Sequence, residues 1–293
     1  LSSSLGTYGV CEDRACRLAM SHWEVLTTSA KLSRLSRLLD MLRTAWSERN
    51  RYNVAQVDVY SGLAFLWAEL VCQTLRWAGK PFSITLHGGN LPGFARRWPR
   101  RVSRLLRSAT AVTTPSRYLL ENMQRYRHDL RLLPNPVDIN AYKFKLRERP
   151  RPYLVWLRAF HSMYNPSLAP KVLSRLARDF PDSRLTMIGP DYGDGSLEAI
   201  RQLATDLSVR GRISISGRIP KKDVFLWIDK GDIFLNTTNV DNTPITVIEA
   251  MASGLCVVST NVGGIPYLLE HEHNAILVPP DDPEAMAMAV QRL

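Results

Sequence analysis

Residues 232–260 read DIFLNTTNVDNTPITVIEAMASGLCVVST: an apolar strand, a polar turn, a helical pattern and a second apolar strand. The runs at 232–238 and 255–260 are rich in Ile, Leu, Phe and Val, which favour buried strands. Two strands joined through a helix pair in parallel, because a parallel pair needs a long crossover connection. The stretch therefore predicts an α/β fold with a parallel sheet.

The same alternation continues along most of the chain. Other strand-like runs, with helical patterns between them, lie at 54–60, 82–88, 110–116, 153–158, 183–190 and 212–217. The segment LPNPVDINAYKFKLRERPRP at 133–152 interrupts the alternation with prolines and charges. It predicts a linker with a domain boundary near Arg149. We therefore predict two doubly wound Rossmann-like domains, residues 1–148 and 149–293, that face a cleft.

The charge of the chain is unevenly distributed. Residues 1–150 carry 24 Lys and Arg against 11 Asp and Glu, a net of +13, whereas residues 151–293 carry 14 against 16, a net of −2. This asymmetry predicts two units with different partners. A basic half suits nucleic acid, an anionic membrane or a phosphate-bearing substrate, and charge alone does not choose among them.

Cysteine usage and hydropathy indicate the compartment. Cys11, Cys16, Cys72 and Cys256 have no C-x-x-C spacing, which favours a reduced, cytoplasmic protein. The most apolar window, residues 62–79, is too polar to span a membrane and predicts a buried amphipathic helix. The chain begins without Met and stops inside the helical pattern PEAMAMAVQRL, so we expect sequence to be missing at both ends.

Two features of the first half place polar groups beside predicted strand ends. Gly6 and Gly9 in LSSSLGTYGV predict a turn whose N–H groups approach a phosphate or sugar, although a plain turn fits equally well. His87 ends a strand-like run and precedes two glycines. An α/β sheet presents its chemistry at such positions; a structural histidine that caps a loop is the alternative.

An arginine-rich stretch, GFARRWPRRVSRLLRS, occupies residues 93–108. Spacings of three and four align its arginines along one helical face, which suits anionic lipid headgroups or a phosphorylated acceptor. A solvated basic face is the alternative. Nucleic acid is disfavoured, because the chain has no helix-turn-helix, zinc-finger or RNP motif. The arginines are Arg96, Arg97, Arg100, Arg101, Arg104 and Arg107.

Strand ends in the second half offer groups that suit a phosphorylated ligand. Arg158 follows a strand and is predicted to hold a diphosphate, with a surface ion pair as the alternative. Gly189 ends another strand, where close backbone approach to a ligand and a simple loop are equally consistent. Residues 243–245 (Thr-Pro-Ile) precede a helix whose first N–H groups suit a phosphate. Glu249, about one turn further, could accept both hydroxyls of a ribose.

Metal binding is not expected. The chain has no D-x-D triplet, the usual carboxylate handle for a metal-bound nucleotide diphosphate. His271 and His273 alternate with Glu270 and Glu272 in a polar run that lacks a distant third ligand. Arg158 and helix N-termini would then meet the phosphate charge.

These motifs, in their order and spacing, resemble the retaining GT-B glycosyltransferases of family 4, over nearly the whole chain. The motifs that carry the resemblance are TPSRYLLENM, LPNPVDINAY, LRAFHSMYNP, LTMIGP, GRIPKKDV, GDIFLNTT, DNTPITVIEAMASGLCVVSTNVGGIPYLL and NAILVPPDDPEAMA. The resemblance implies that the second domain holds a nucleotide-sugar donor and the first domain the acceptor.

The resemblance also implies roles for individual residues. Arg158 would contact the donor diphosphate, Glu249 the ribose, and His87 the transferred sugar. The backbone N–H groups of the segment Thr243, Pro244 and Ile245, in which the proline has none, would contact the phosphates. The backbone around Arg218 and Ile219 would contact the base.

Three positions depart from the family pattern. Asp241 stands at the first acid of the paired-glutamate motif, so its arm is one methylene shorter. The segment SMYNP at 162–166 contains no lysine where the family has its second basic residue. Tyr267 replaces a frequent glutamate after Gly-Gly-Ile-Pro. The short arm of Asp241 can still orient a sugar hydroxyl or stabilise an oxocarbenium-like centre.

We therefore expect a metal-independent hexosyltransferase without a cofactor. It would move a sugar from a UDP- or GDP-sugar to a hydroxyl of a glycolipid or polysaccharide precursor, with retained configuration. A GT-B-fold nucleotide-sugar epimerase and a non-catalytic nucleotide-sugar-binding homologue are the alternatives. The expected location is cytoplasmic and peripheral on the inner face of the membrane.

Overall fold

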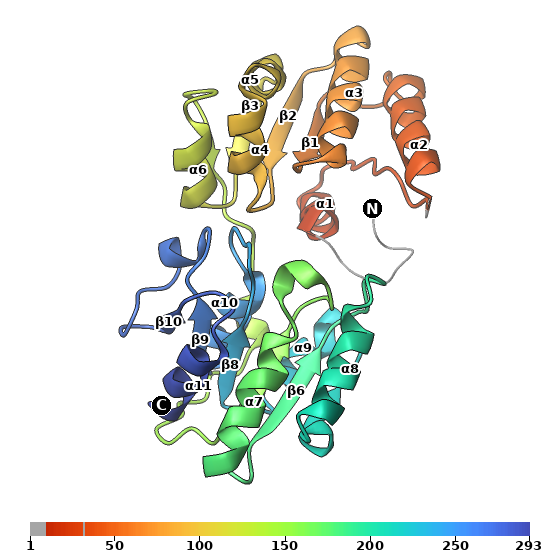
Figure 1. Cartoon of the computed structure of the whole chain (residues 1–293). Helices are drawn as coiled ribbons and strands as arrows, with labels where there is room; N and C mark the ends of the chain where they lie inside the picture. The colour runs from red at the N-terminus through yellow and green to blue at the C-terminus, as the bar shows by residue number, and fades with distance from the viewer. Residues whose placement is uncertain (1–9, 32) are drawn as a thin grey trace. The chain divides into compact units, whose positions relative to one another are not determined.

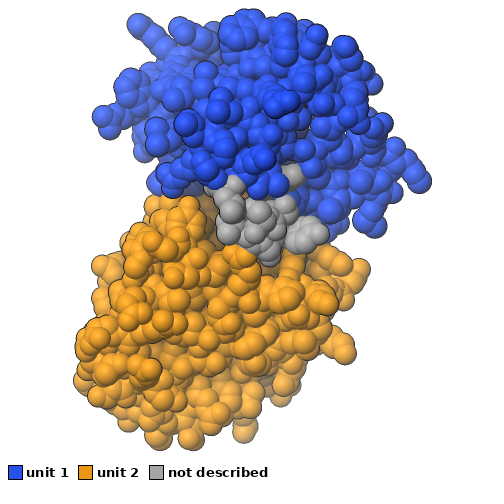
Figure 2. Space-filling model, turned by 90° about the vertical axis from the view of Figure 1, so that its right-hand side faces the viewer, with its two compact units in different colours: residues 1–136 blue, residues 137–293 orange. Residues whose placement is uncertain are grey.

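The chain forms two compact units in a computed structural model that describes residues 10–31 and 33–293 (Figure 1). One unit extends to Pro136 and the other begins at Val137; Figure 2 colours them separately. Each unit is built around its own parallel sheet. The α/β class predicted from the alternation is confirmed in both.

The segment 137–148, which the sequence places in the first domain, packs on the second unit. The buried guanidinium of Arg147 donates to carboxylate oxygens of Asp229 at 3.0 Å and Asp232 at 3.3 Å. It also donates to the backbone carbonyl of Ser253. These contacts explain why the compact units divide before this segment.

The sheet of the first unit has four parallel strands. Its strands are β1 (Ala55–Val59), β2 (Phe82–Leu86), β3 (Ala111–Thr114) and β4 (Arg131–Leu132), in the order β1-β2-β3-β4. Its helices are α1 (Val10–Met20), α2 (Arg34–Ser47), α3 (Leu63–Trp77), α4 (Leu91–Arg97), α5 (Pro99–Ser108) and α6 (Arg117–Met123). Because the strands follow chain order, right-handed crossovers place α3, α5 and α6 on one face.

The two faces of this sheet differ in polarity. Phe82, Ile84 and Leu86 of β2 alternate toward the apolar core of the unit. Thr85 lies on the opposite face, where its hydroxyl accepts from Arg14 of α1 at 3.0 Å. The helix α1 therefore contacts a polar sheet face beside the strand end that carries His87.

The sheet of the second unit has six parallel strands. They are β5 (Tyr153–Leu157), β6 (Arg184–Ile188), β7 (Ile213–Ile215), β8 (Ile233–Asn236), β9 (Cys256–Thr260) and β10 (Ile276–Val278), in the order β10-β9-β8-β5-β6-β7. Its helices are α7 (Leu168–Asp179), α8 (Ser196–Asp206), α9 (Val224–Ile228), α10 (Ile245–Ala252) and α11 (Pro283–Gln291). Short 3-10 turns lie at Ile139–Ala141, Ser162–Tyr164, Arg210–Arg212, Lys221–Asp223 and Ile265–Tyr267.

Helices cover both faces of this second sheet. Leu154 and Trp156 of β5 point into a core shared with α7 and α11, whereas Val155 and Leu157 point into a core shared with α9 and α10. The strand order reverses between β5 and β8, which makes this sheet doubly wound. The β8–α10–β9 unit is the stretch 232–260, and its strands pair in parallel as predicted.

Among the described residues, none of the helices is both long enough and apolar enough to cross a membrane.

Candidate functional site

The carboxyl ends of β5 and β8 meet at the reversal of strand order in the second unit. Open α/β sheets bind ligands at such a switch point. Arg158 follows β5, and the loop containing Asp241 follows β8. The structure brings these two residues together, since the guanidinium of Arg158 pairs with Oδ2 of Asp241.

Arg158 is held on two sides. Its guanidinium carbon lies 4.9 Å from the ring centroid of Tyr164, a cation–π distance. Asp241 binds one terminal nitrogen. Within the described part of the chain, the buried Nε of Arg158 has no hydrogen-bond acceptor. A buried donor without an acceptor costs free energy, so the site retains an unused capacity to bind an anion.

The loop with Asp241 is fixed by the glycine pair after β9. The N–H of Gly264 donates to the carbonyl of Asp241 at 3.0 Å. A Cβ on Gly263 would lie 2.2 Å from the carbonyl oxygen of Asp241, and one on Gly264 would lie 1.7 Å from that of Asn242. Only glycine therefore allows the two loops to approach this closely.

Gly189 is also required by packing. Its φ of +148° lies in a region that side chains disfavour, and an added Cβ would stand 1.8 Å from the carbonyl oxygen of Arg158. The N–H of Arg158 donates to the carbonyl of Ile188 at 3.0 Å. Gly189 thus holds the end of β6 against the end of β5. Its predicted contact with the donor stays a prediction.

The helix α10 begins beside this switch point. Pro244 stands at its N-cap, Thr243 precedes the cap, and Ile245 is the first helical residue. The first N–H groups of a helix have no acceptor within the helix and carry the positive end of its dipole. Inside the same first turn, the buried Oγ1 of Thr246 has no hydrogen-bond partner among the described residues. The predicted phosphate position is thus lined by donors.

Glu249 is 5% exposed on the buried side of α10. Burial raises the pKa of its carboxyl above the ordinary value, against the opposing effects of a hydrogen bond with Tyr142 and the charges of Lys221 and Arg158. Burial and the Glu249 charge in turn raise the pKa of Tyr142. A buried carboxylate that already accepts one hydroxyl can recognise others.

Arg218 and Ile219 lie in the loop after β7. Arg218 is exposed, whereas Ile219 is partly buried and packs against the core shared by α9 and α10. A base contact through the backbone of these residues stays a prediction. Gly6 and Gly9 lie outside the described residues.

In the first unit, His87 follows β2 and is 5% exposed. Its ring stacks on Tyr60, with centroids 5.2 Å apart and an interplanar angle of 19°. Its Nε2 lies 3.3 Å from Oδ1 of Asp58, close enough for charge attraction. No hydrogen bond of good geometry reaches this nitrogen from any described residue. His87 is therefore oriented by its neighbours, with Nε2 turned toward Asp58.

Asp58 sits in a polar group beneath His87. Burial alone would raise its pKa, but His87 and the hydrogen bonds from Cys11 and Gln56 hold the pKa below the ordinary value. Burial, followed by the Asp58 charge, raises the pKa of the Cys11 thiol to about 12. The carboxylate thus stays charged beside the imidazole, while the thiol stays protonated.

The arginine-rich stretch does not form the single helical face that its spacing predicts. Trp98 and Pro99 divide it into α4 and α5, because proline starts a helix more readily than it continues one. Arg101 is also not free on that face: its Nε donates to both carboxylate oxygens of Glu69 of α3, at 2.7 and 2.8 Å. The prediction was wrong in these two respects.

Within the described residues, no group of three or more His, Cys, Asp or Glu side chains is arranged to hold a metal ion. His271 instead accepts a hydrogen bond from the N–H of Leu277 at 3.0 Å.

Comparisons with known proteins match both units to one group. The family model described as "Glycosyltransferase Family 4" matches residues 11–141, and the model described as "Glycosyl transferases group 1" matches residues 151–293. The chain belongs to the group 1, family 4 glycosyltransferases. Its fold is the GT-B fold: a crystal structure of HepE from Anabaena matches with a TM-score of 0.72 and 17% identity, over 94% of this chain and 78% of HepE.

Two curated relatives share shorter segments with this family 4 chain. Amylovoran biosynthesis glycosyltransferase AmsK of Erwinia amylovora is 35% identical over 37% of this chain and 27% of AmsK. The D-inositol 3-phosphate glycosyltransferase of Mycobacteroides abscessus is 29% identical over 46% of this chain and 31% of that protein. The matched segments therefore span about a third of these relatives' lengths.

Three residues of this glycosyltransferase chain were not predicted from the sequence. Tyr142 lies in the proline-rich linker and gave no signal for its contact with Glu249. Tyr164 occupies the segment in which the family resemblance expects a lysine, and places an aromatic ring beside Arg158. Asp58 could have been found, because it is a charged residue inside the apolar run VAQVDVY.

Proposed function

We propose that this family 4 chain transfers a sugar from a nucleotide-sugar donor to an acceptor hydroxyl with retained anomeric configuration. The observation that carries the proposal is the convergence of Arg158, the N-terminus of α10 and the buried Glu249 at the switch point of the second unit. A diphosphate needs the first two groups, and a ribose needs the third. One nucleotide sugar contains both the diphosphate and the ribose that these three groups can bind.

The donor that we propose is a UDP- or GDP-sugar. Anabaena HepE, which has the same fold, has been crystallised with UDP and glucose. In this chain the phosphates would lie at the N–H groups of Thr243 and Ile245, within reach of Arg158. The base would rest on the backbone at Arg218 and Ile219. No metal is needed in this scheme, because cationic and N–H groups meet the phosphate charge.

The reaction that we propose leaves the acceptor proton to the departing phosphate. Asp241 would orient a sugar hydroxyl or stabilise positive charge at the anomeric carbon. His87, which follows β2 in the first unit, would contact the transferred sugar.

The acceptor that we propose is a lipid-linked or polysaccharide precursor, and the location is cytoplasmic and peripheral on the membrane. One relative is named for amylovoran biosynthesis, and a putative glycosyltransferase of Bacillus subtilis is named for teichuronic acid biosynthesis. The net charge of +13 in residues 1–150 suits an anionic membrane surface.

The test is incubation with a panel of UDP-, GDP- and ADP-sugars, with and without acceptor lipids, in the presence of EDTA. Nucleotide release that depends on acceptor, with an α- or β-linkage that matches the donor, supports the proposal. Epimer formation without acceptor would assign the chain to a nucleotide-sugar epimerase. Binding without turnover would identify a non-catalytic homologue, and activity lost in EDTA would contradict metal independence.

A further inference from the structure

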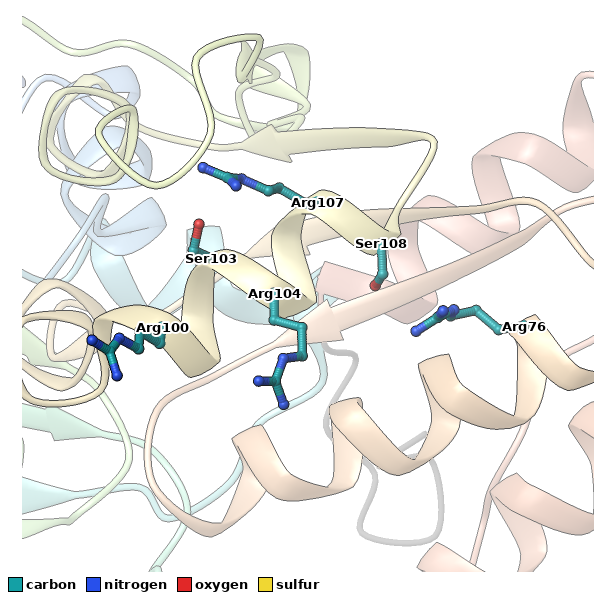
Figure 3. A pocket seen from close by; sticks show the side chains of 6 residues that line it. All are labelled: Arg76, Arg100, Ser103, Arg104, Arg107 and Ser108. Atoms are coloured by element: carbon teal, nitrogen blue, oxygen red, sulfur yellow. The ribbon is translucent and has the colours of Figure 1, made fainter.

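An open groove of about 800 Å³ lies between α3 and α5 of the first unit (Figure 3). Four arginines and two serines line it: Arg76, Arg100, Ser103, Arg104, Arg107 and Ser108. No acidic side chain is among them. In Figure 3 the side chains of Arg76 and Arg104 extend into the space between the two helices. The groove therefore concentrates positive charge from two separate segments of the chain.

Most arginines of this groove have no acidic partner among the described residues. Arg100, Arg104 and Arg107 recur along one face of α5, and none of them forms an ion pair with a described residue. Arg101 differs, because Glu69 neutralises it. Like charges on one helical face repel one another and destabilise the helix. An anion in the groove would remove this repulsion, and guanidinium groups bind phosphate oxygens in pairs.

An apolar stripe on α3 borders the groove. Its side chains recur at helical spacing; Leu63 and Trp77 are each 72% exposed, and Leu66 and Leu70 are 41% and 40% exposed. The opposite side of α3 packs into the core of the unit through Phe65, Ala68, Cys72 and Leu75. The helix is thus apolar on two faces, one of which is partly exposed. Arg76, which lines the groove, immediately precedes Trp77 in this stripe.

We propose that the α3–α5 surface docks on the headgroup region of an anionic lipid bilayer. Headgroup phosphates would occupy the arginine groove, while the leucines of α3 enter the acyl boundary and Trp77 lies at the interface. Nucleic acid would satisfy the arginines but would leave the leucines exposed to water. The combination of uncompensated cations with a bordering apolar stripe therefore favours a membrane.

The inference deepens the peripheral location in the proposed function, but its test needs no donor and no turnover. Sedimentation measures binding to vesicles of phosphatidylcholine alone and of phosphatidylcholine with phosphatidylglycerol. We expect binding to the anionic vesicles only. Each arginine near such a surface contributes about fivefold, so the triple change R100Q/R104Q/R107Q should weaken binding on the order of 100-fold. A higher salt concentration should also weaken the binding of the wild-type protein to anionic vesicles.

A matched control removes the same charge elsewhere. Arg178, Arg201 and Arg210 are exposed on the second unit, and the variant R178Q/R201Q/R210Q should bind anionic vesicles like the wild type. A second arm tests the apolar stripe: Leu66→Ser and Leu70→Ser remove exposed side chains and should each weaken binding on the order of tenfold. Circular dichroism confirms that each variant is folded.

Three results would overturn the inference. The groove variant could retain its affinity for anionic vesicles, or the control variant could lose as much affinity as the groove variant. The wild type could also bind single-stranded RNA but no vesicle, which would assign the surface to nucleic acid. None of these results depends on sugar transfer. A negative vesicle-binding result therefore does not contradict the proposed reaction, and an absence of sugar transfer does not prevent the measurement of vesicle binding.

Discussion

Replacement of Glu249 by Gln tests the donor site with a minimal change of shape. The side chain is 5% exposed and is hydrogen-bonded with Tyr142. Its carboxylate is proposed to accept two ribose hydroxyls, whereas an amide offers one neutral acceptor. A hydrogen bond to a charged group is worth about 1 to 1.5 kcal/mol more than a neutral one. Two such bonds give about 2 to 3 kcal/mol, a weakening of the donor Kd on the order of 30- to 150-fold.

The stability of the same variant separates binding from folding. Burial raises the pKa of Glu249 in the folded protein. Its contribution to stability is therefore full at low pH and is lost as the pH rises through the raised folded value. Glu249→Gln removes a carboxylate that is costly to ionise in the core. We expect its thermal midpoint at neutral pH to be no lower than that of the wild type.

The pH dependence of donor binding is a second test of the ribose contact proposed for Glu249. The ribose hydroxyls need the ionised carboxylate, so wild-type affinity should fall as the pH is lowered through the raised pKa of Glu249. Glu249→Gln should lack this fall. Titration calorimetry with UDP- and GDP-sugars measures both effects, and Glu198→Gln on the exposed surface of α8 is the control. Unchanged affinity in Glu249→Gln, or an equal loss in the control, would refute the ribose assignment.

Three further changes have defined outcomes. Tyr142→Phe removes a hydrogen bond that lowers the pKa of Glu249. The loss of donor affinity on acidification should therefore begin at a higher pH in this variant, and titration calorimetry measures it. Gly264→Ala places a Cβ 1.7 Å from a backbone oxygen and should lower thermal stability by about 2 kcal/mol or more, whereas Gly211→Ala enters open space and should leave the melting curve near that of the wild type. Arg147→Met leaves the buried carboxylate of Asp232 with fewer partners and should lower the free energy of unfolding, measured in urea, by about 3 kcal/mol. A decrease of less than about 1 kcal/mol would contradict the anchoring role of Arg147.

The strands and the order of elements could be predicted because each depends on local sequence. Apolar runs such as 82–86 and 256–260 form strands at the positions that their composition indicates. The short strands β4 and β10 were not predicted from the sequence. The break between α4 and α5 was readable from Pro99, but the regular spacing of the arginines favoured one continuous face.

The contacts at the candidate site depend on folding at long range. Residue types and strand ends predicted Arg158, His87 and Glu249 as site residues, but their partners lie far away in sequence. Asp58 reaches His87 only because β1 and β2 pair in register. Tyr142 reaches Glu249 only because the linker packs on the second unit. No local pattern records such pairings, so the sequence predicts candidate groups but not the residues that contact them.

Asp241 and Glu249, the two acids of the stretch 232–260 that we propose contact the donor, are held in different ways. Glu249 is buried in a helix, where burial governs its protonation. Asp241 is a loop residue whose oxygens engage the N–H of Asn242, at 2.7 Å, and the guanidinium of Arg158. A donor diphosphate at Arg158 would compete with Asp241 for the same cation. Donor binding would then release one carboxylate oxygen for a sugar hydroxyl, so the short arm of Asp241 would couple phosphate binding to sugar orientation.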